Sequence, residues 1–264
     1  MNPKHIEELR AAKHILEHPG LTARLTTIIG TPIEKGIALL PRRWSATINA
    51  ATQRSLEAAL RLAVSSIGTD SRKTPRNLWH KAAATASGAG GGAWGLLALA
   101  VELPISTTIM LRSIAEIARS NGEDLRRAEA QLACLEVFAL GGRTSRDNAA
   151  ESGYFAVRTA LARAVAEAAE FIAERGLTKE GAPVIVRLIS LIAGRFGITV
   201  SEKAAAQSVP VVGALGGALI NLAFTHHFQE MAKGHFTVRR LERLYGNEEV
   251  RNAYVQLGEE WKRS

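Results

Sequence analysis

Five carboxylate and imidazole side chains lie in or beside apolar parts of this sequence, where such groups could do chemistry. Glu102 ends an uncharged stretch, Glu136 lies within CLEVFALGG, and two adjacent histidines follow a second uncharged stretch. Glutamates and histidines on helices can bind a metal ion, transfer protons or activate water. The candidates for such catalytic chemistry are Glu102, Glu136, His226, His227 and His235.

Structural needs alone could also explain polar residues in these places. A buried carboxylate or imidazole requires a hydrogen-bond partner, so the groups can meet in one internal network. Such a network is predicted to contain Glu102, Arg112, Glu116, Glu136, Asn221 and His227. The single cysteine, Cys134, excludes a disulfide framework and a multi-cysteine metal site. We therefore predict neither a metal nor a cofactor.

One further motif is formally present. Residues 90–95 match GxGxxG, a dinucleotide-binding pattern, but the preceding residues are alanine-rich and the neighbourhood has a helical period. The pattern requires a strand before the glycines, so we do not interpret it as a nucleotide site.

Two runs combine several basic residues with one tryptophan: PRRW at residues 41–44 and RKTPRNLWHK at residues 72–81. The second run precedes an uncharged stretch, and cationic anchors beside an interfacial tryptophan are typical of segments that bind membranes. Alternatively, lysine and arginine stems cover half-buried tryptophans. Neither run contains a recognition helix or an array of stacking aromatics, which argues against nucleic acid. The membrane-binding candidates are Arg42, Arg43, Trp44, Arg72, Lys73, Arg76, Trp79 and Lys81.

The positive charge of the chain is concentrated near its N-terminus. The net charge is +8 over 264 residues, and the first 81 residues hold 13 Lys and Arg against 6 Asp and Glu. Such a surplus suits anionic lipid headgroups, although a solvated surface explains it equally well. The first 20 residues lack the continuous apolar core of a signal peptide, which predicts a cytoplasmic protein.

Helical periodicity dominates the whole chain and predicts an all-α, single-domain bundle of many helices. We expect helices over residues 2–17, 41–67, 154–176 and 247–264. Glu123 and Asp124 are expected in the first turn of a helix that ends before Gly141. Thr199 and Glu202 have the spacing of a capping box, which predicts a helix start there.

Two glycine-rich stretches, residues 82–101 and 204–225, contain no charge and are long enough to cross a bilayer. Their many small residues favour central core helices or conditionally inserting helices, with permanent transmembrane helices as the alternative. Within them, Gly88 and Gly92, and Gly213 and Gly217, have GxxxG spacing, which lets two helices approach closely.

The direction in which these two stretches pack decides what meets Glu102. An antiparallel pair places Glu102 level with residues 201–203, where Lys203 and water could satisfy it, whereas a parallel pair places it beside residues 225–227. We expect the parallel pair, because it gives Glu102, His226 and His227 partners at once.

Four segments together resemble the EcsC protein family: VELPISTTIMLRSIAEIARSNGEDL from residue 101, CLEVFALGG from 134, ESGYFAVRTALA from 151, and VPVVGALGGALINLAFTHHFQEMAKGHFTVRRLERLYG from 209. The resemblance covers residues 61–250, between a basic helical extension over residues 1–60 and a C-terminal helix over residues 251–264. It implies a bacterial, all-helical, cytoplasm-facing protein linked to membranes, from a family without an agreed activity. Its characteristic segments contain Glu102, Glu136, Asn221, His227 and His235.

The sequence thus predicts a peripheral protein on the inner face of the cell membrane that binds anionic lipid or a membrane protein. The alternative is a hydrolase that uses a glutamate and histidine cluster, with or without a metal. We favour the binding protein. The oligomeric state stays open.

Overall fold

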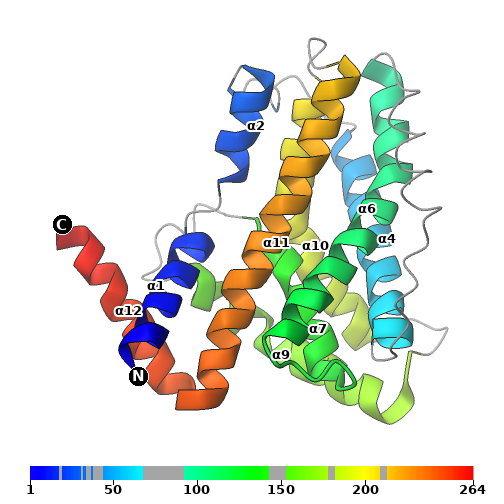
Figure 1. The fold of residues 1–264 in the computed structure, drawn as a ribbon. Coiled ribbons are helices and arrows are strands. Elements are labelled where there is room, and N and C mark those ends of the chain that lie inside the picture. Colours follow the sequence, from blue (N-terminus) through cyan, green and yellow to red (C-terminus); the bar gives the residue numbers. More distant parts are fainter. Residues whose placement is uncertain are drawn as a thin grey trace.

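The computed structural model describes residues 1–17, 20–30, 32–33, 37, 44–67, 92–142, 153–177, 182–208 and 213–263. The described residues are almost entirely helical and contain no strand (Figure 1). The predicted all-α class is confirmed. The helices are α1 (Pro3–Glu17), α2 (Leu21–Ile29), α4 (Trp44–Leu62), the π-helical η1 (Ala63–Ile67), α6 (Gly92–Ser120), α7 (Ala128–Leu140), α9 (Gly153–Arg175), α10 (Pro183–Gln207), α11 (Gly213–Tyr245) and α12 (Asn247–Arg263).

Helix α7 is the most deeply buried element of the bundle. Every residue from 130 to 142 is buried, which explains why CLEVFALGG has no polar face. The Phe138 ring lies 4.9 Å from that of Phe196 on α10 and 5.3 Å from that of Phe228 on α11. Side chains that project from α7 therefore meet partners on several surrounding helices.

Helices α6 and α11 run in parallel, as expected (Figure 1). Ser113 on α6 bonds to Gln229 on α11, and Glu123, three residues after the end of α6, bonds to Arg239 on α11. Both pairs are separated by 116 residues, as expected for two parallel helices. Two contacts show that α10 runs antiparallel to α11. Phe196 packs against Phe228, and Lys203, later in α10, lies over Phe224, which comes earlier in α11. The beginnings of α6 and α11 therefore lie at the same end of the bundle as the last turns of α10.

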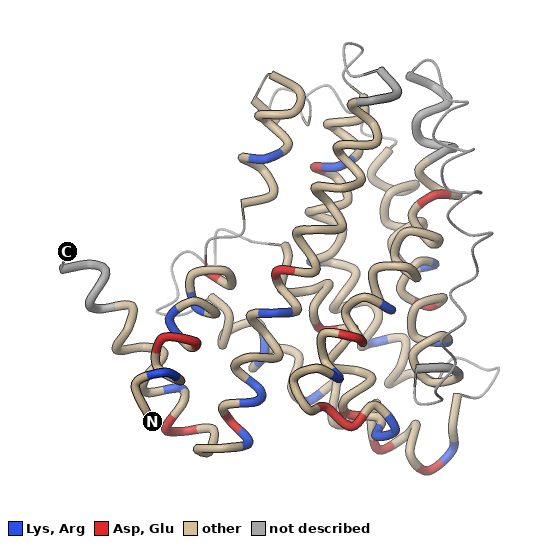
Figure 2. Tube along the Cα trace, viewed as in Figure 1, with Lys and Arg blue, Asp and Glu red and all other residues tan. Residues whose placement is uncertain are grey.

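Charge is unevenly distributed along the bundle (Figure 2). In α11, residues 213–229 contain no Lys, Arg, Asp or Glu, whereas residues 230–245 contain six. In α6, Glu102 is the one charged residue within residues 92–111. We call the beginnings of α6 and α11, with the last turns of α10, the charge-poor end.

Two predicted helix starts are wrong. Helix α7 begins at Ala128, because Glu123 and Asp124 lie in the non-helical segment before it and bind arginine side chains instead of helix N–H groups. Thr199 and Glu202 lie inside α10, where the Thr199 hydroxyl donates to the Phe196 carbonyl. Both errors have the same cause: these side chains have the types and spacing of capping residues, but they bind other partners in the structure.

The helices expected over residues 2–17, 154–176 and 247–264 are confirmed, with small changes at their ends, and so is the described part, residues 44–67, of the helix expected over 41–67. The uncharged stretch 204–225 is not one helix, because α10 ends at Gln207 and α11 begins at Gly213. In the other uncharged stretch, residues 82–91 lie outside the described residues. The first helix ends at Glu17, and the last begins at Asn247. Helix α6 continues through Pro104 to Ser120. By length and composition, one described helix, α10, could cross a bilayer. Its most apolar 18 residues have a mean hydropathy of 1.7, and half of them are buried inside the structure. A core helix of this kind passes the same criterion, so the observation is weak evidence for a span.

Candidate functional site

Glu102 forms a buried ion pair with Lys203 at the charge-poor end. Lys203 Nζ lies 2.6 Å from Glu102 Oε1, and the two side chains are 0% and 6% exposed. The same ammonium lies 4.8 Å from the centre of the Phe224 ring, a cation–π contact. One lysine thus joins α10 to both α6 and α11.

The adjacent histidines of α11 have different surroundings. His226 is exposed, and Arg24 Nη1 on α2 lies 2.6 Å from its Nδ1. His227 is buried, and its Nε2 donates to the Gly141 carbonyl at 3.2 Å. Burial lowers the pKa of His227 to about 4, although the bond to Gly141 opposes the shift. His227 is therefore a neutral imidazole that caps the end of α7.

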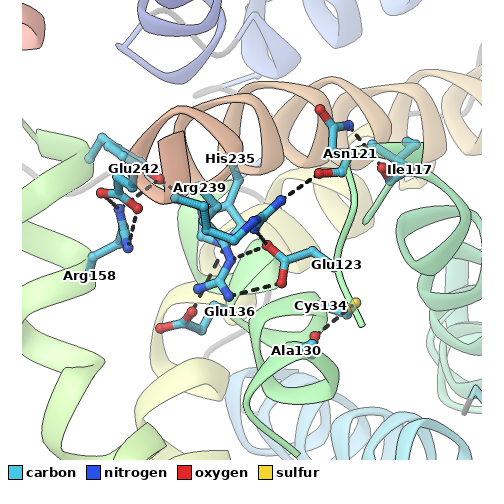
Figure 3. Close-up of polar contacts among 12 residues, drawn as sticks. Ile117, Asn121, Glu123, Ala130, Cys134, Glu136, Arg158, His235, Arg239 and Glu242 are labelled. Carbon is cyan, nitrogen blue, oxygen red and sulfur yellow. Dashed lines mark hydrogen bonds and ion pairs between the residues drawn. The ribbon is translucent and has the colours of Figure 1, made fainter. Parts of the chain in front are cut away.

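A buried hydroxyl, imidazole and carboxylate come together from three helices. The Tyr154 hydroxyl on α9 lies 3.0 Å from His235 Nδ1 on α11. On the other side of the ring, His235 Nε2 lies 4.0 Å from Glu136 Oε2 on α7 (Figure 3). The His235 and Glu136 side chains are 0% and 7% exposed. The hydroxyl and the imidazole are hydrogen-bonded, whereas the 4.0 Å separation of the imidazole and the carboxylate is too long for a direct hydrogen bond.

Two arginines flank this group, and each is held by a carboxylate (Figure 3). Arg158 donates two bonds to Glu242, at 2.7 and 3.1 Å, and a third to the Tyr154 hydroxyl at 3.3 Å. Arg239 donates two bonds to Glu123, at 2.8 and 3.1 Å, and Arg243 also binds Glu123. These bidentate pairs fix where the cations lie.

Burial moves the pKa values of this group in opposite directions. It raises the pKa of Glu136, against the nearby positive charges of Arg158 and Arg239. It lowers the pKa of His235 well below its ordinary value, and the same two arginines add to the effect. Burial also raises the pKa of Tyr154. All three groups thus favour their neutral forms.

Large apolar side chains are exposed at the charge-poor end. Leu219 and Leu222 on α11 are 50% and 65% exposed, and Val101 on α6 is 55% exposed. Because the two helices are parallel with an offset of 116 residues, Val101 lies level with residue 217. The three side chains therefore occupy neighbouring helices at similar heights.

The EcsC protein family model matches residues 3–241 of the chain. The chain belongs to the EcsC protein family. No curated protein and no solved structure is found to match it. The family match starts at residue 3, so it includes the N-terminal residues that the sequence sets apart as an extension. In this EcsC chain, Leu9, Leu16, Leu21 and Leu25 of that region are buried in the core.

The single polar network expected in the EcsC chain is wrong. Glu102 pairs with Lys203, His227 with the Gly141 carbonyl, and Glu136 faces His235. Asn221 Oδ1 is buried without a hydrogen-bond partner among the described residues, and Glu116 is exposed. Arg112 is half-buried in the second half of α6. The residues thus divide among separate sites.

The expected meeting of Glu102 with the two histidines is also wrong, although the helix direction is right. The offset of 116 residues places Glu102 level with residue 218 instead of residues 225–227. Lys203 reaches Glu102 because it belongs to the antiparallel α10, which ends before Pro210.

Of the four glycines expected to permit close helix packing, the structure tests Gly217 alone. A Cβ on Gly217 would meet no atom within 4 Å, so this position faces open space. Gly88 lies outside the described residues. The backbone of Gly92 and Gly213 is described, but the atoms around these two glycines are not. By contrast, a Cβ on Gly142 would lie 2.1 Å from the Arg195 carbonyl oxygen. Gly142 is therefore a site where α7 and α10 nearly touch.

Most of the predicted membrane-binding residues lie outside the described residues. These are Arg42, Arg43, Arg72, Lys73, Arg76, Trp79 and Lys81. Trp44, the first residue of α4, is half-buried and packs against the core, which agrees with the alternative interpretation for this one tryptophan.

Sequence reasoning missed Tyr154, Arg158, Arg239 and Glu242 as partners of Glu136 and His235. Local signals existed, since Tyr154 lies three residues before Val157 on the apolar stripe of α9, with Arg158 one turn later. Among the described residues, no group of three or more His, Cys, Asp or Glu is placed to hold a metal. Cys134 is buried, which raises its pKa.

We expect the protein to lose free energy of unfolding in acid, because His227 is buried in its neutral form. Its folded pKa is about 4, below the ordinary value of 6.5, so between these pH values the unfolded chain binds the extra proton. The contribution of the neutral His227 to the free energy of unfolding is therefore complete above pH 6.5. That free energy falls by about 3 kcal/mol as the pH drops to about 4. Urea unfolding at several pH values measures this loss. The variant His227→Gln keeps a donor for Gly141, so its stability should fall less over the same window. Equal losses in both proteins would contradict the assignment.

Proposed function

We propose that this EcsC-family protein associates peripherally with the cytoplasmic face of the cell membrane and binds anionic lipid through its charge-poor end. A membrane protein that is embedded in the same lipid is the alternative partner. One observation carries the proposal: Leu219, Leu222 and Val101 are exposed where the beginnings of α6 and α11 are nearly free of charge. Exposed apolar patches that lack nearby charge mark protein or membrane interaction sites.

One basic residue of the N-terminal region lies at the same end of the bundle. Arg24 on α2 lies beside His226 of α11, so a cation borders the apolar residues. The N-terminal 81 residues carry the positive surplus of the sequence, and each well-placed Lys or Arg adds about 1 kcal/mol of attraction to an anionic surface. Charges that attract and apolar side chains that insert are the two signals that stable peripheral binding requires.

Flotation with lipid vesicles tests the proposal through two matched substitutions on α11. Leu222→Asp removes an apolar side chain from the charge-poor end and should weaken vesicle binding at least about tenfold, because a leucine contributes about 2 kcal/mol on burial. Leu244→Asp is the control, since Leu244 is 58% exposed near the opposite end of α11. It should bind like the wild type.

The composition of the vesicles provides the second arm. Binding of the wild type should rise with the share of anionic lipid and fall with added salt, because surface charges are screened. Equal losses for Leu222→Asp and Leu244→Asp, or binding indifferent to lipid charge and salt, would rule out this mode of attachment.

Hydrolysis is a second candidate, and one observation favours it. Glu136 and His235 face each other across 4.0 Å, and their pKa values are shifted in opposite directions, as in many acid–base pairs. Ester hydrolysis by the purified protein that is lost in Glu136→Gln, with folding preserved, would favour this function over binding alone.

A further inference from the structure

His235 Nε2 is buried and has no hydrogen-bond partner among the described residues. The nearest acidic oxygen is Glu136 Oε2 at 4.0 Å, which is beyond the range of a direct hydrogen bond. A buried polar atom without a partner is costly and uncommon in native proteins. A small ligand that bonds to both atoms would supply the missing partner of Nε2.

The hydrogen bonds on the other side of the ring determine which nitrogen carries the proton. Arg158 can only donate, so it occupies a lone pair of the Tyr154 oxygen. The Tyr154 hydroxyl then donates its own proton to His235 Nδ1, 3.0 Å away. Burial lowers the pKa of His235, so the ring holds one proton, and that proton lies on Nε2. Nε2 thus points a donor toward Glu136.

We propose that one water molecule binds between His235 and Glu136, accepting from Nε2–H and bonding to Oε2. A water oxygen about 2.8 Å from each atom bridges a separation of 4.0 Å. Bridging waters of this kind satisfy buried polar groups almost as well as a direct contact. The bridge extends the hydrogen bonds of Tyr154 and His235 to Glu136 and so links α9, α11 and α7.

The surroundings favour water over a cation at this site. Arg158 and Arg239 both exert positive charge on Glu136 and His235, which opposes a metal ion. Glu136 keeps 7% of its side chain exposed while His235 keeps none, so Glu136 lies nearer to solvent. This inference does not rest on membrane binding.

A crystal structure of the wild type at about 1.5 Å resolution tests the site. We expect a density peak within hydrogen-bond distance of both His235 Nε2 and Glu136 Oε2. A direct bond between the two side chains, or no peak between them, would overturn the proposal. His227 is the internal control, because its Nε2 already donates to the Gly141 carbonyl and should have no such bridge.

Nitrogen NMR of the imidazole rings tests the same site in solution. We expect His235 to show the Nε2–H tautomer, with its Nδ1 resonance far downfield of Nε2 and no titration between pH 5 and 8. Glu136→Gln keeps an acceptor oxygen and should leave this pattern unchanged, whereas Glu136→Leu should shift the Nε2–H signal. The Nδ1–H tautomer, or a doubly protonated ring at pH 7, would contradict the assigned bonds even if the leucine variant fails to fold.

Discussion

Gly142→Ala should destabilise the protein by about 3 kcal/mol or more, the largest effect we expect from adding one methyl group. The new Cβ would lie 2.1 Å from the Arg195 carbonyl oxygen and 2.9 Å from its carbon. These are backbone atoms of α10, so they cannot rotate away as a side chain can. Overpacking usually costs about 1–3 kcal/mol even where side chains give way. Urea unfolding of the variant measures the loss.

The same clash would disturb the end of α7. Arg195 donates to the carbonyl oxygens of Ala139 and Gly142, at 3.0 and 2.8 Å, and so caps groups that have no partner within the helix. Gly194→Ala is a matched control one residue away on α10. A Cβ on Gly194 would meet nothing within 4 Å, so this change should stabilise the helix by about 0.5–1 kcal/mol. Similar effects from both substitutions would contradict the packing described at Gly142.

Lys203→Met should cost about 3–5 kcal/mol, because it leaves the Glu102 carboxylate buried without its counter-charge. The two side chains are almost fully buried, and the Nζ–Oε1 distance is 2.6 Å. A lone buried charge is more damaging than the loss of the attraction itself. The free energy of unfolding, measured in urea, gives the cost.

The double variant Glu102→Met with Lys203→Met separates these two effects. Two apolar side chains of similar volume should restore stability to about the wild-type level or above, since buried pairs are often replaceable in this way. Arg163→Met is the surface control: Arg163 is 81% exposed in its pair with Glu167, so stability should hardly change. Additive losses in the double variant would show that Glu102 and Lys203 do not act as a pair.

Helix existence could be predicted from this sequence because it depends on local periodicity. The stripe from Val157 to Ile172 in α9 and the acidic start of α12 at Glu248 are local patterns, and both helices form. Helix starts are less predictable when capping residues have distant partners. Glu123 binds Arg239, 116 residues away, and no local signal reveals that contact.

Contacts between helices depend on register, which periodicity does not determine. The parallel direction of α6 and α11 could be inferred, but Lys203 as the partner of Glu102 followed only from the antiparallel alternative. Both hold in the structure, because Lys203 belongs to a third helix, α10. GxxxG spacing likewise does not say which face of a helix is covered. Gly217 faces open space, whereas Gly142, without that spacing, lies against α10.

The charge-poor end was partly predictable, because two uncharged stretches stand out in the sequence. The structure adds that residues 92–101 and 213–225 begin parallel helices at the same end, with Leu219 and Leu222 exposed. Their parallel direction could be inferred from the sequence, but the exposure of Leu219 and Leu222 could not, because it depends on which face of α11 the other helices cover.

The central claim is that the charge-poor end enters the membrane, and the depth of a label tests it most directly. An environment-sensitive fluorophore is attached at Leu222→Cys or, separately, at Leu244→Cys, with the buried Cys134 replaced by alanine. With anionic vesicles, the emission at position 222 should shift to the blue and be quenched by brominated lipid tails, while position 244 reports water. Quenching at position 244 but not at 222, or at neither position while the protein is bound, would contradict the account.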